Sequence, residues 1–420
     1  MEKTNIIVIS LDEVRPDHLS CYGYQKISTP AIDQIANEGI KFTQCFSSAD
    51  FTPIAMGSVI TGRNPNKHGV RDAYSYLTGP TIAEILKEDS YRTAGFVGNG
   101  LLAKRHGFAQ GFDLFNETSK ETSWLEVQYP NSGNDEIVYE GNYWVEEFFD
   151  WLKSNYQKKF FIWGHLYETH EGSGASLVER GLIDKGESLE FDYYDAKIKM
   201  ADEKLIGRLI GTLKELNIYD NTTIVVMSDH GTNLGEHPVK DIPWREKGTR
   251  YPQHTTMYDH DLHVAMMMKG SGLPQGKIIN GMIRSIDLVP TLLEYIGISA
   301  QTHDFDGQSW LPLLQQDQDR NEVYSEDLFE PRGLGALQSI RTTEYKFMRN
   351  LTLGQEFYFD LKNDPGEKED VKEKIGQDKL IKIRKKLNSY LFTKAVSQKK
   401  FSMEEKEAIN QRLRGLGYIE

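Results

Sequence analysis

The residues from Ile6 to Leu11 form a run that is apolar except for Ser10 and rich in β-branched side chains, and it ends at two acids, Asp12 and Glu13. Such a run predicts a strand that is buried on both faces, which is typical of a parallel sheet. Three similar runs follow predicted helices further along the chain: Thr93 to Val97, Phe160 to Trp163 and Thr223 to Met227. This alternation predicts an α/β fold in which helices flank a doubly wound, mostly parallel sheet.

The predicted architecture changes in the last quarter of the chain. Short β-rich segments at Ser339 to Arg341, Tyr345 to Met348 and Glu356 to Asp360 precede a charged helical tail. We therefore predict a catalytic α/β domain at residues 1–315 and a small antiparallel C-terminal subdomain with a helical tail at 316–420. The helix predicted at Tyr194 to Leu216 has apolar residues at helical spacing, and we expect it to cover the sheet without taking part in chemistry.

The charge and the cysteine content exclude some classes of function. A formal net charge of -13 argues against sequence-independent binding of nucleic acid or of an anionic membrane. Cys21 and Cys45 are the two cysteines, so no disulfide framework is expected, and this usage fits a reducing compartment. The apolar run near the N-terminus is too short for a signal peptide or a membrane span, which predicts a cytoplasmic protein. A homo-oligomer is compatible with this composition.

Two predicted strands end in side chains that bind metals. The first ends at Asp12 and Glu13, and the last at Ser228, followed by Asp229 and His230. Acids at the carboxyl end of a strand suit a site, although an acidic turn is the simpler interpretation of Asp12 and Glu13 alone. Oxygen and nitrogen donors together suit Zn²⁺, Mn²⁺ or a similar ion.

A hydroxyl residue lies between these two segments, at Thr52, and Pro53 follows it. The simplest interpretation is a helix N-cap with proline at the first helical position. A helix N-terminus also attracts anions, because its free N–H groups and dipole are positive. The same threonine can serve as cap and as nucleophile.

Further motifs follow in order along the chain: Asp17-His18-Leu19-Ser20-Cys21-Tyr22-Gly23-Tyr24, Thr61-Gly62-Arg63, His68-Gly69-Val70, Gly235-Glu236-His237, Met257-Tyr258-Asp259, Asp287-Leu288-Val289-Pro290-Thr291, Asp306-Gly307-Gln308-Ser309 and Tyr358-Phe359-Asp360-Leu361. Together with the acidic strand ends, the series resembles the sulfatase-type members of the alkaline phosphatase superfamily. The resemblance covers nearly the whole chain.

This resemblance implies that Asp12, Asp229 and His230 bind a divalent metal, with Glu13 as a further candidate ligand. It also implies that the nucleophile is Thr52, which would contact the metal. Sulfatases proper use a cysteine or serine that is oxidised to formylglycine, with proline two positions on and arginine four positions on. This chain has Thr52, Ile54 and Met56 at those positions. Threonine cannot form the aldehyde, so the resemblance shifts toward the threonine-using phosphodiesterases of the superfamily.

Two histidines complete the predicted site. His170 lies where sulfatases carry a substrate-binding histidine. His254 lies where they hold a lysine, and where some threonine-using relatives place a histidine ligand. The pair could bind a second metal, with Glu168 the most obvious carboxylate, or the substrate anion. One or two ions are expected, Zn²⁺ or Mn²⁺ first and Mg²⁺ or Ca²⁺ as alternatives.

These residues predict a metal-dependent hydrolase of phosphate-type esters, either phosphodiesters or phosphonate and phosphate monoesters. In the relatives, a threonine alkoxide attacks phosphorus and forms a covalent intermediate. Two alternatives stay open: a sulfatase that works without formylglycine, and a catalytically silent homologue that binds a metal or an anion. The expected partner is a small-molecule phosphate or sulfate ester, with no nucleic acid and no membrane.

Overall fold

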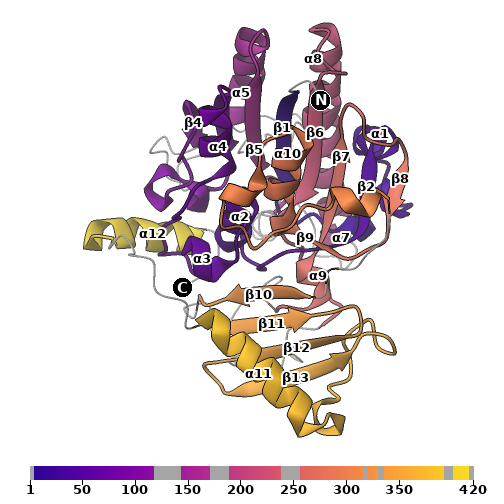
Figure 1. Cartoon of the computed structure of the whole chain (residues 1–420), viewed down its shortest axis with the longest axis vertical. Helices are drawn as coiled ribbons and strands as arrows, with labels where there is room; N and C mark the ends of the chain where they lie inside the picture. The colour runs from indigo at the N-terminus through magenta and orange to yellow at the C-terminus, as the bar shows by residue number, and fades with distance from the viewer. Residues whose placement is uncertain are drawn as a thin grey trace.

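The computed structural model describes residues 4–117, 143–170, 189–237, 256–315, 320, 322–329, 335–391 and 401–415. In this part of the chain the strands form two sheets. The large one is built from β1 to β9, and the small one, from β10 to β13, lies below it in Figure 1. None of the helices in these ranges combines the length and the apolar character that crossing a membrane requires.

The large sheet has nine strands, in the order β4-β3-β5-β1-β6-β7-β2-β8, with β9 paired to β2. Strands β1, β3, β4, β5 and β6 run parallel to one another, whereas β7 runs antiparallel to β6 and β2. The bounds are β1 Asn5–Leu11, β2 Ile40–Phe46, β3 Arg92–Val97, β4 Leu114–Glu117, β5 Phe160–Leu166, β6 Thr222–Ser228, β7 His263–Lys269, β8 Lys277–Ile279 and β9 Ile283–Arg284. The predicted α/β fold with a mostly parallel sheet is confirmed.

Helices cover both faces of this sheet, because alternate residues of the central strands are apolar on each side. Ile7 and Ile9 of β1 pack with α1, α5, α7 and α8, whereas Ile6 and Val8 pack with α2, α4 and α10. Both faces of β1 are thus removed from water, as the apolar run requires. The helices are α1 Pro30–Asn37, α2 Thr52–Thr61, α3 Pro65–His68, α4 Ile82–Glu88, α5 Tyr143–Asn155, α7 Leu189–Ala201, α8 Arg208–Glu215, α9 Asp259–Leu262 and α10 Leu288–Tyr295.

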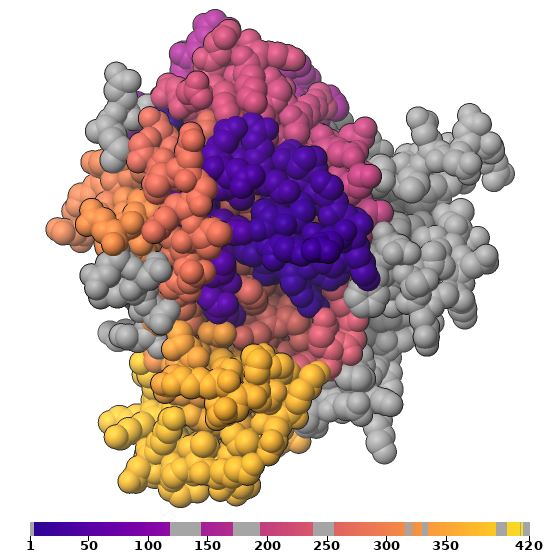
Figure 2. Space-filling model, turned by 90° about the vertical axis from the view of Figure 1, so that its right-hand side faces the viewer, coloured from indigo at the N-terminus to yellow at the C-terminus, as the bar shows by residue number. Residues whose placement is uncertain are grey.

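The small sheet is an antiparallel meander of four strands, β10 Val323–Asp327, β11 Leu337–Arg341, β12 Tyr345–Asn350 and β13 Gln355–Asp360. Helix α11 (Gln377–Leu391) packs on one face through Leu380, Ile383 and Leu387. This part of the chain appears in yellow below the main body in Figure 2. Helix α12 (Met403–Gly415) returns to the large sheet, because Ile409 and Leu413 are buried in the main core.

Candidate functional site

Three adjacent strands bring the site together at one edge of the large sheet. Leu11, the last residue of β1, pairs with Leu166 of β5 and with Ser228 of β6. The residues that follow β1 and β6, Asp12 and Asp229, therefore emerge side by side at the carboxyl edge. The backbone N–H of Glu13, the residue after Asp12, donates to Asp229 Oδ1 at 3.1 Å.

Thr52 lies at the start of α2 and is fully buried against this edge. Its Oγ1 is 3.2 Å from His230 Nε2 and 3.5 Å from Asp12 Oδ1. The N-cap is Phe51, and Thr52 is the first helical residue, so the predicted capping role of Thr52 is wrong by one position. Since the hydroxyl makes no cap hydrogen bond, it is directed at the imidazole and the carboxylate instead.

His230 is held in one tautomer. Its Nδ1 lies 2.9 Å from the carbonyl oxygen of Gly231, which can only accept, so Nδ1 carries the hydrogen. In the neutral ring, Nε2 then offers a lone pair toward Thr52. Burial would lower the pKa of His230, but Asp229, Asp12 and Glu13 outweigh it and raise this pKa to about 9. A positive charge is therefore strongly favoured at this position.

The donor set fits a divalent cation. His230 Nε2 lies 3.2 Å from Thr52 Oγ1, 3.8 Å from Asp12 Oδ1 and 3.5 Å from Asp229 Oδ2. Ligand atoms that share a tetrahedral Zn²⁺ at 2.0–2.1 Å are about 3.4 Å apart. Asp229 Oδ2 is buried and has no hydrogen-bond partner among the described residues, and a buried charged oxygen of this kind is costly unless a cation compensates it.

The pKa values of the two aspartates are shifted in opposite directions. Burial raises the pKa of Asp229, and the neighbouring charge of Asp12 raises it further. For Asp12, burial acts in the same direction, but the hydrogen bond from His165 and the charges of His170 and His230 lower its pKa. Two acids this close in a dry site repel each other, which is the arrangement that a bound cation relieves.

His165 belongs to the site, although the sequence analysis gave it no role. It is the partner of Ser10 in the β1–β5 register. Its Nε2 is 3.2 Å from Asp12 Oδ2, and its Nδ1 is 2.9 Å from Ser10 Oγ. Asn99, which follows β3, adds a weaker contact, with Nδ2 3.4 Å from Asp12 Oδ2. Both side chains contact the oxygen of Asp12 that does not face Thr52, and so orient the carboxylate, as groups around a metal ligand do.

Glu13 and His170 form a second pair beside Asp12. Glu13 Oε1 is 3.0 Å from His170 Nε2, and one ligand atom each of Asp12, Glu13 and His170 lie within 4.8 Å of one another. Burial lowers the pKa of His170, but Glu13 and Asp12 outweigh this effect and the pKa is raised overall. His170 is therefore suited to carry a proton or to bind an anion.

Helix α7 fixes this pair from behind. The hydroxyl of Tyr194 donates to the carbonyl of Glu13 at 2.6 Å and accepts from the N–H of Arg15 at 2.8 Å. One turn further on, Lys197 Nζ donates to the carbonyl of His170 at 2.5 Å. The expectation that this segment takes no part in the chemistry overlooked these contacts, since it rested on its apolar spacing alone.

The remaining predicted residues are less closely tied to the cluster. Glu168 has both carboxylate oxygens buried without a hydrogen-bond partner among the described residues, and burial raises its pKa to about 7. The described residues form two groups of possible metal ligands, Asp12 with His165 and Asp229, and Asp12 with Glu13 and His170, and Glu168 is in neither. His254 lies outside the described residues, so its predicted role stays a prediction.

Comparisons with known proteins agree on one family. The Sulfatase family profile matches residues 4–298, and the profile "N-sulphoglucosamine sulphohydrolase, C-terminal" matches residues 249–396. An arylsulfatase of Clostridium perfringens is 24% identical over 91% of this chain and 94% of its own length. Two solved structures superpose at 19–20% identity. The phosphonate monoester hydrolase of Agrobacterium radiobacter has a TM-score of 0.71 and covers 92% of this chain and 95% of its own. A 2-O GAG sulfatase has a TM-score of 0.72, with 93% and 91% covered.

Proposed function

The chain belongs to the sulfatase family and is a sulfatase-family ester hydrolase, and on that premise we propose that it hydrolyses a sulfate ester through Thr52, with the help of a divalent metal and without formylglycine. Sulfatases predominate among the relatives, which favours a sulfate ester over the phosphate-type ester that the threonine alone suggests. The position of Thr52 carries the proposal. Its hydroxyl is buried, lies at a helix start and is 3.2 Å from His230 Nε2.

Asp12, Asp229, His230 and Thr52 would hold the metal, since their donor atoms have the spacing and the charge that it needs. When bound, a divalent cation lowers the pKa of a coordinated hydroxyl and neutralises charge on the oxyanion. With His230 Nε2 committed as a ligand, Asp12 Oδ1 is the nearby acceptor toward which the Thr52 hydroxyl donates, at 3.5 Å. His165 and Asn99 keep the other oxygen of Asp12 in place.

The reaction then proceeds in two displacements. Thr52 Oγ1 gives its proton to Asp12 and attacks sulfur, the bond from sulfur to the ester oxygen breaks, and the sulfo group stays on Thr52. The leaving alkoxide needs a proton, and His170 can supply it because Glu13 and Asp12 keep its pKa raised. Water then attacks sulfur, the bond from sulfur to Thr52 Oγ1 breaks, and Thr52 takes its proton back from Asp12 as sulfate leaves. His170 regains its proton from this water.

A phosphate-type ester is the second candidate, and one observation favours it. Thr52 is the hydroxyl residue at the helix start, and no oxidation converts threonine into the aldehyde that formylglycine sulfatases use. The fold likeness to a phosphonate monoester hydrolase is compatible with this candidate. The same two displacements would then occur at phosphorus, with a phosphothreonine between them.

A matched set of nitrophenyl esters separates the two candidates. Rates on the sulfate, the phosphate monoester, the phosphonate monoester and the phosphodiester would be measured for the wild type and for Thr52→Ala, alongside metal content per chain. Sulfate turnover that depends on Thr52 supports the proposal. Preference for a phosphorus ester selects the second candidate, and turnover that survives in Thr52→Ala rules out both. Bound metal without any turnover would indicate a silent binding homologue.

A further inference from the structure

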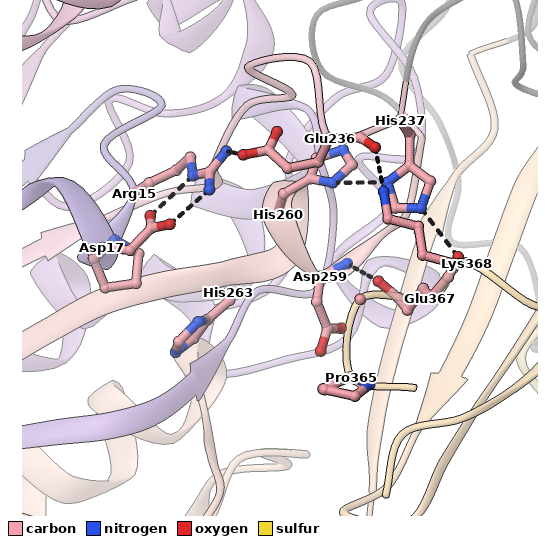
Figure 3. Close-up of a pocket in the computed structure, with 12 residues that line it drawn as sticks. Arg15, Asp17, Glu236, His237, Asp259, His260, His263, Pro365, Glu367 and Lys368 are labelled. Atoms are coloured by element: carbon pink, nitrogen blue, oxygen red, sulfur yellow. Dashed lines mark hydrogen bonds and ion pairs between the residues drawn. The ribbon is translucent and has the colours of Figure 1, made fainter. Parts of the chain in front are cut away.

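A cavity of about 260 Å³ lies outside the cluster around Thr52, at the seam between the large sheet and the C-terminal subdomain (Figure 3). One wall is formed by Glu236 and His237, which follow the His230 loop, and another by His260 of α9. The loop after β13, at Glu367 and Lys368, closes it from the side of the subdomain. Nothing in the proposed reaction uses this cavity.

Two imidazoles meet at its wall. The Nδ1 atoms of His237 and His260 are 3.4 Å apart, and the ring centroids are 5.2 Å apart. Two nitrogen ligands of one tetrahedral ion, each at 2.0–2.1 Å, would be about 3.4 Å apart as well. His237 is held flat against Tyr258, with ring centroids 3.7 Å apart, so its position is fixed by packing.

The other nitrogen of each ring is already committed as a donor. His237 Nε2 is 3.0 Å from the carbonyl oxygen of Glu367, which can only accept. His260 Nε2 faces Thr256 Oγ1 at 3.2 Å and Asp261 Oδ1 at 3.3 Å. Thr256 donates its own hydroxyl hydrogen to Asp261 Oδ2 at 2.5 Å, so its oxygen accepts from His260.

Both Nδ1 atoms therefore present lone pairs to each other when the rings are neutral. Burial lowers the pKa of both histidines, and the charges of Lys368 near His237 and of Arg15 near His260 lower it further. A shared proton is thus disfavoured at neutral pH. An imidazole whose second nitrogen donates to a carbonyl or a carboxylate is the usual form of a metal-binding histidine.

The charges around the cavity are close to balanced, so the two imidazoles carry the argument for a ligand. Four acids and two bases line it: Asp17, Glu236, Asp259 and Glu367 against Arg15 and Lys368. All four acids are engaged by salt bridges: Asp17 and Glu236 to Arg15, Asp259 to Arg341, and Glu367 to Lys346. Both imidazoles line the cavity, which has room for water.

We propose that His237 and His260 form a second metal site, which binds a divalent transition-metal ion such as Zn²⁺ through their two Nδ1 atoms, with water completing the coordination. Imidazole ligands suit Zn²⁺, Ni²⁺ and Cu²⁺ better than Mg²⁺ or Ca²⁺. The ion would connect the His230 loop to α9, beside the point where Glu367 docks. This site is separate from the four donors assigned to the reaction and does not depend on the proposed function.

The test counts Zn²⁺ per chain in the full-length protein. Each protein is stripped with a chelator, titrated with Zn²⁺ by calorimetry, and analysed for metal after desalting. We expect His237→Gln and His260→Gln each to bind one Zn²⁺ fewer than the wild type. Glutamine keeps an N–H that can still donate to the carbonyl of Glu367. An unchanged count in both variants overturns the proposal.

His263 provides the matched control, because it lines the same cavity but its Nε2 donates to the carbonyl of Thr43 at 2.9 Å. His263→Gln should keep the wild-type count. Asp229→Asn separates the two sites, since it should lose the ion assigned to the reaction and keep the one at His237. Thermal unfolding guards against misfolded variants. Zn²⁺ should raise the Tm of the wild type and of His263→Gln by more than that of His237→Gln, and equal shifts would contradict the site.

Discussion

Replacing Tyr194 by phenylalanine tests whether α7 controls the reactive cluster from a distance. The change removes one oxygen and keeps the buried ring. That oxygen donates to the carbonyl of Glu13 at 2.6 Å and accepts from the N–H of Arg15 at 2.8 Å. Glu13 has a φ of 59°, in the left-handed region that a residue with a side chain adopts only at a cost. Tyr194 therefore bridges the two sides of a strained turn.

The expected effect has two components. A buried backbone group that loses a hydrogen-bond partner costs about 1–3 kcal/mol, so loss of both contacts should lower the free energy of unfolding by about 3 kcal/mol. Groups that orient metal ligands contribute about 10-fold to 100-fold in metal affinity or activity when they are removed, which corresponds to about 1.4–2.7 kcal/mol. We expect kcat/KM and metal affinity to fall within that range, because the N–H of Glu13 then holds Asp229 less firmly and His170 loses its fixed placement.

Tyr22 supplies the control that separates these two components. Its hydroxyl donates to the carbonyl of Phe42 at 2.9 Å and accepts from the N–H of Met266 at 3.1 Å, between strands away from the cluster. Tyr22→Phe removes an equivalent buried hydroxyl and should cost comparable stability. Calorimetric titration with Zn²⁺ or Mn²⁺, urea unfolding and steady-state kinetics would be run on both variants.

The reasoning is refuted if Tyr194→Phe binds metal and turns over substrate like the wild type. It is also refuted if Tyr22→Phe loses the same metal affinity, because the loss would then follow from general destabilisation. A fall in kcat at unchanged metal affinity would limit the role of α7 to the placement of His170.

Four further predictions follow from single contacts. Thr52→Ala should lower kcat by at least about 10³-fold while much of the metal affinity stays, whereas Thr52→Ser should keep measurable turnover; rates on the preferred nitrophenyl ester decide this. Asp229→Asn should lose the catalytic metal, as elemental analysis after desalting would show, because it removes the charge of a buried carboxylate, one oxygen of which has no hydrogen-bond partner among the described residues. Burial and the charges of Arg63 and Arg71 lower the pKa of His68 to about 3, so the unfolded state takes up its proton first. Stability should fall as the pH drops below about 6.5, by up to about 1.4 kcal/mol per pH unit from this group, and urea unfolding of His68→Gln should show a shallower decline. Arg71→Met should destabilise the protein by about 3–5 kcal/mol in the same assay, because it leaves the carboxylate of Glu326 buried without its ion pair.

The sequence predicts the part of the site that follows from strand ends. Asp12 and Asp229 could be found because each follows an apolar run, and the carboxyl ends of parallel strands meet at one edge. His165 could not be found in this way, since its contact with Asp12 depends on β5 lying next to β1. The order of strands in a sheet is set by packing across the whole domain, which no local pattern records.

A local sequence pattern also placed the start of a helix one residue too late. Thr52 before Pro53 has the sequence of an N-cap, yet the helix begins at Thr52 and its hydroxyl is turned toward His230. The long helix predicted after residue 193 is present as α7, a π-helical turn at Asp202–Gly207 and α8. The apolar spacing of this segment correctly predicted which side is buried. It gave no sign of the polar contacts that Tyr194 and Lys197 make.

The kink at Glu13 explains how two consecutive acids can serve one site. In an extended strand, neighbouring side chains point to opposite faces, so Asp12 and Glu13 could not both reach the cluster. The left-handed conformation of Glu13 turns the chain by one residue and brings its carboxylate to His170. This conformation costs on the order of 1–2 kcal/mol. The N–H of Glu13 gives a hydrogen bond to Asp229, and its carbonyl receives one from Tyr194. The contacts that offset the strain are therefore the ones that tie Asp229 and α7 to the reactive edge, and a change that relaxes the turn should disturb both carboxylates together.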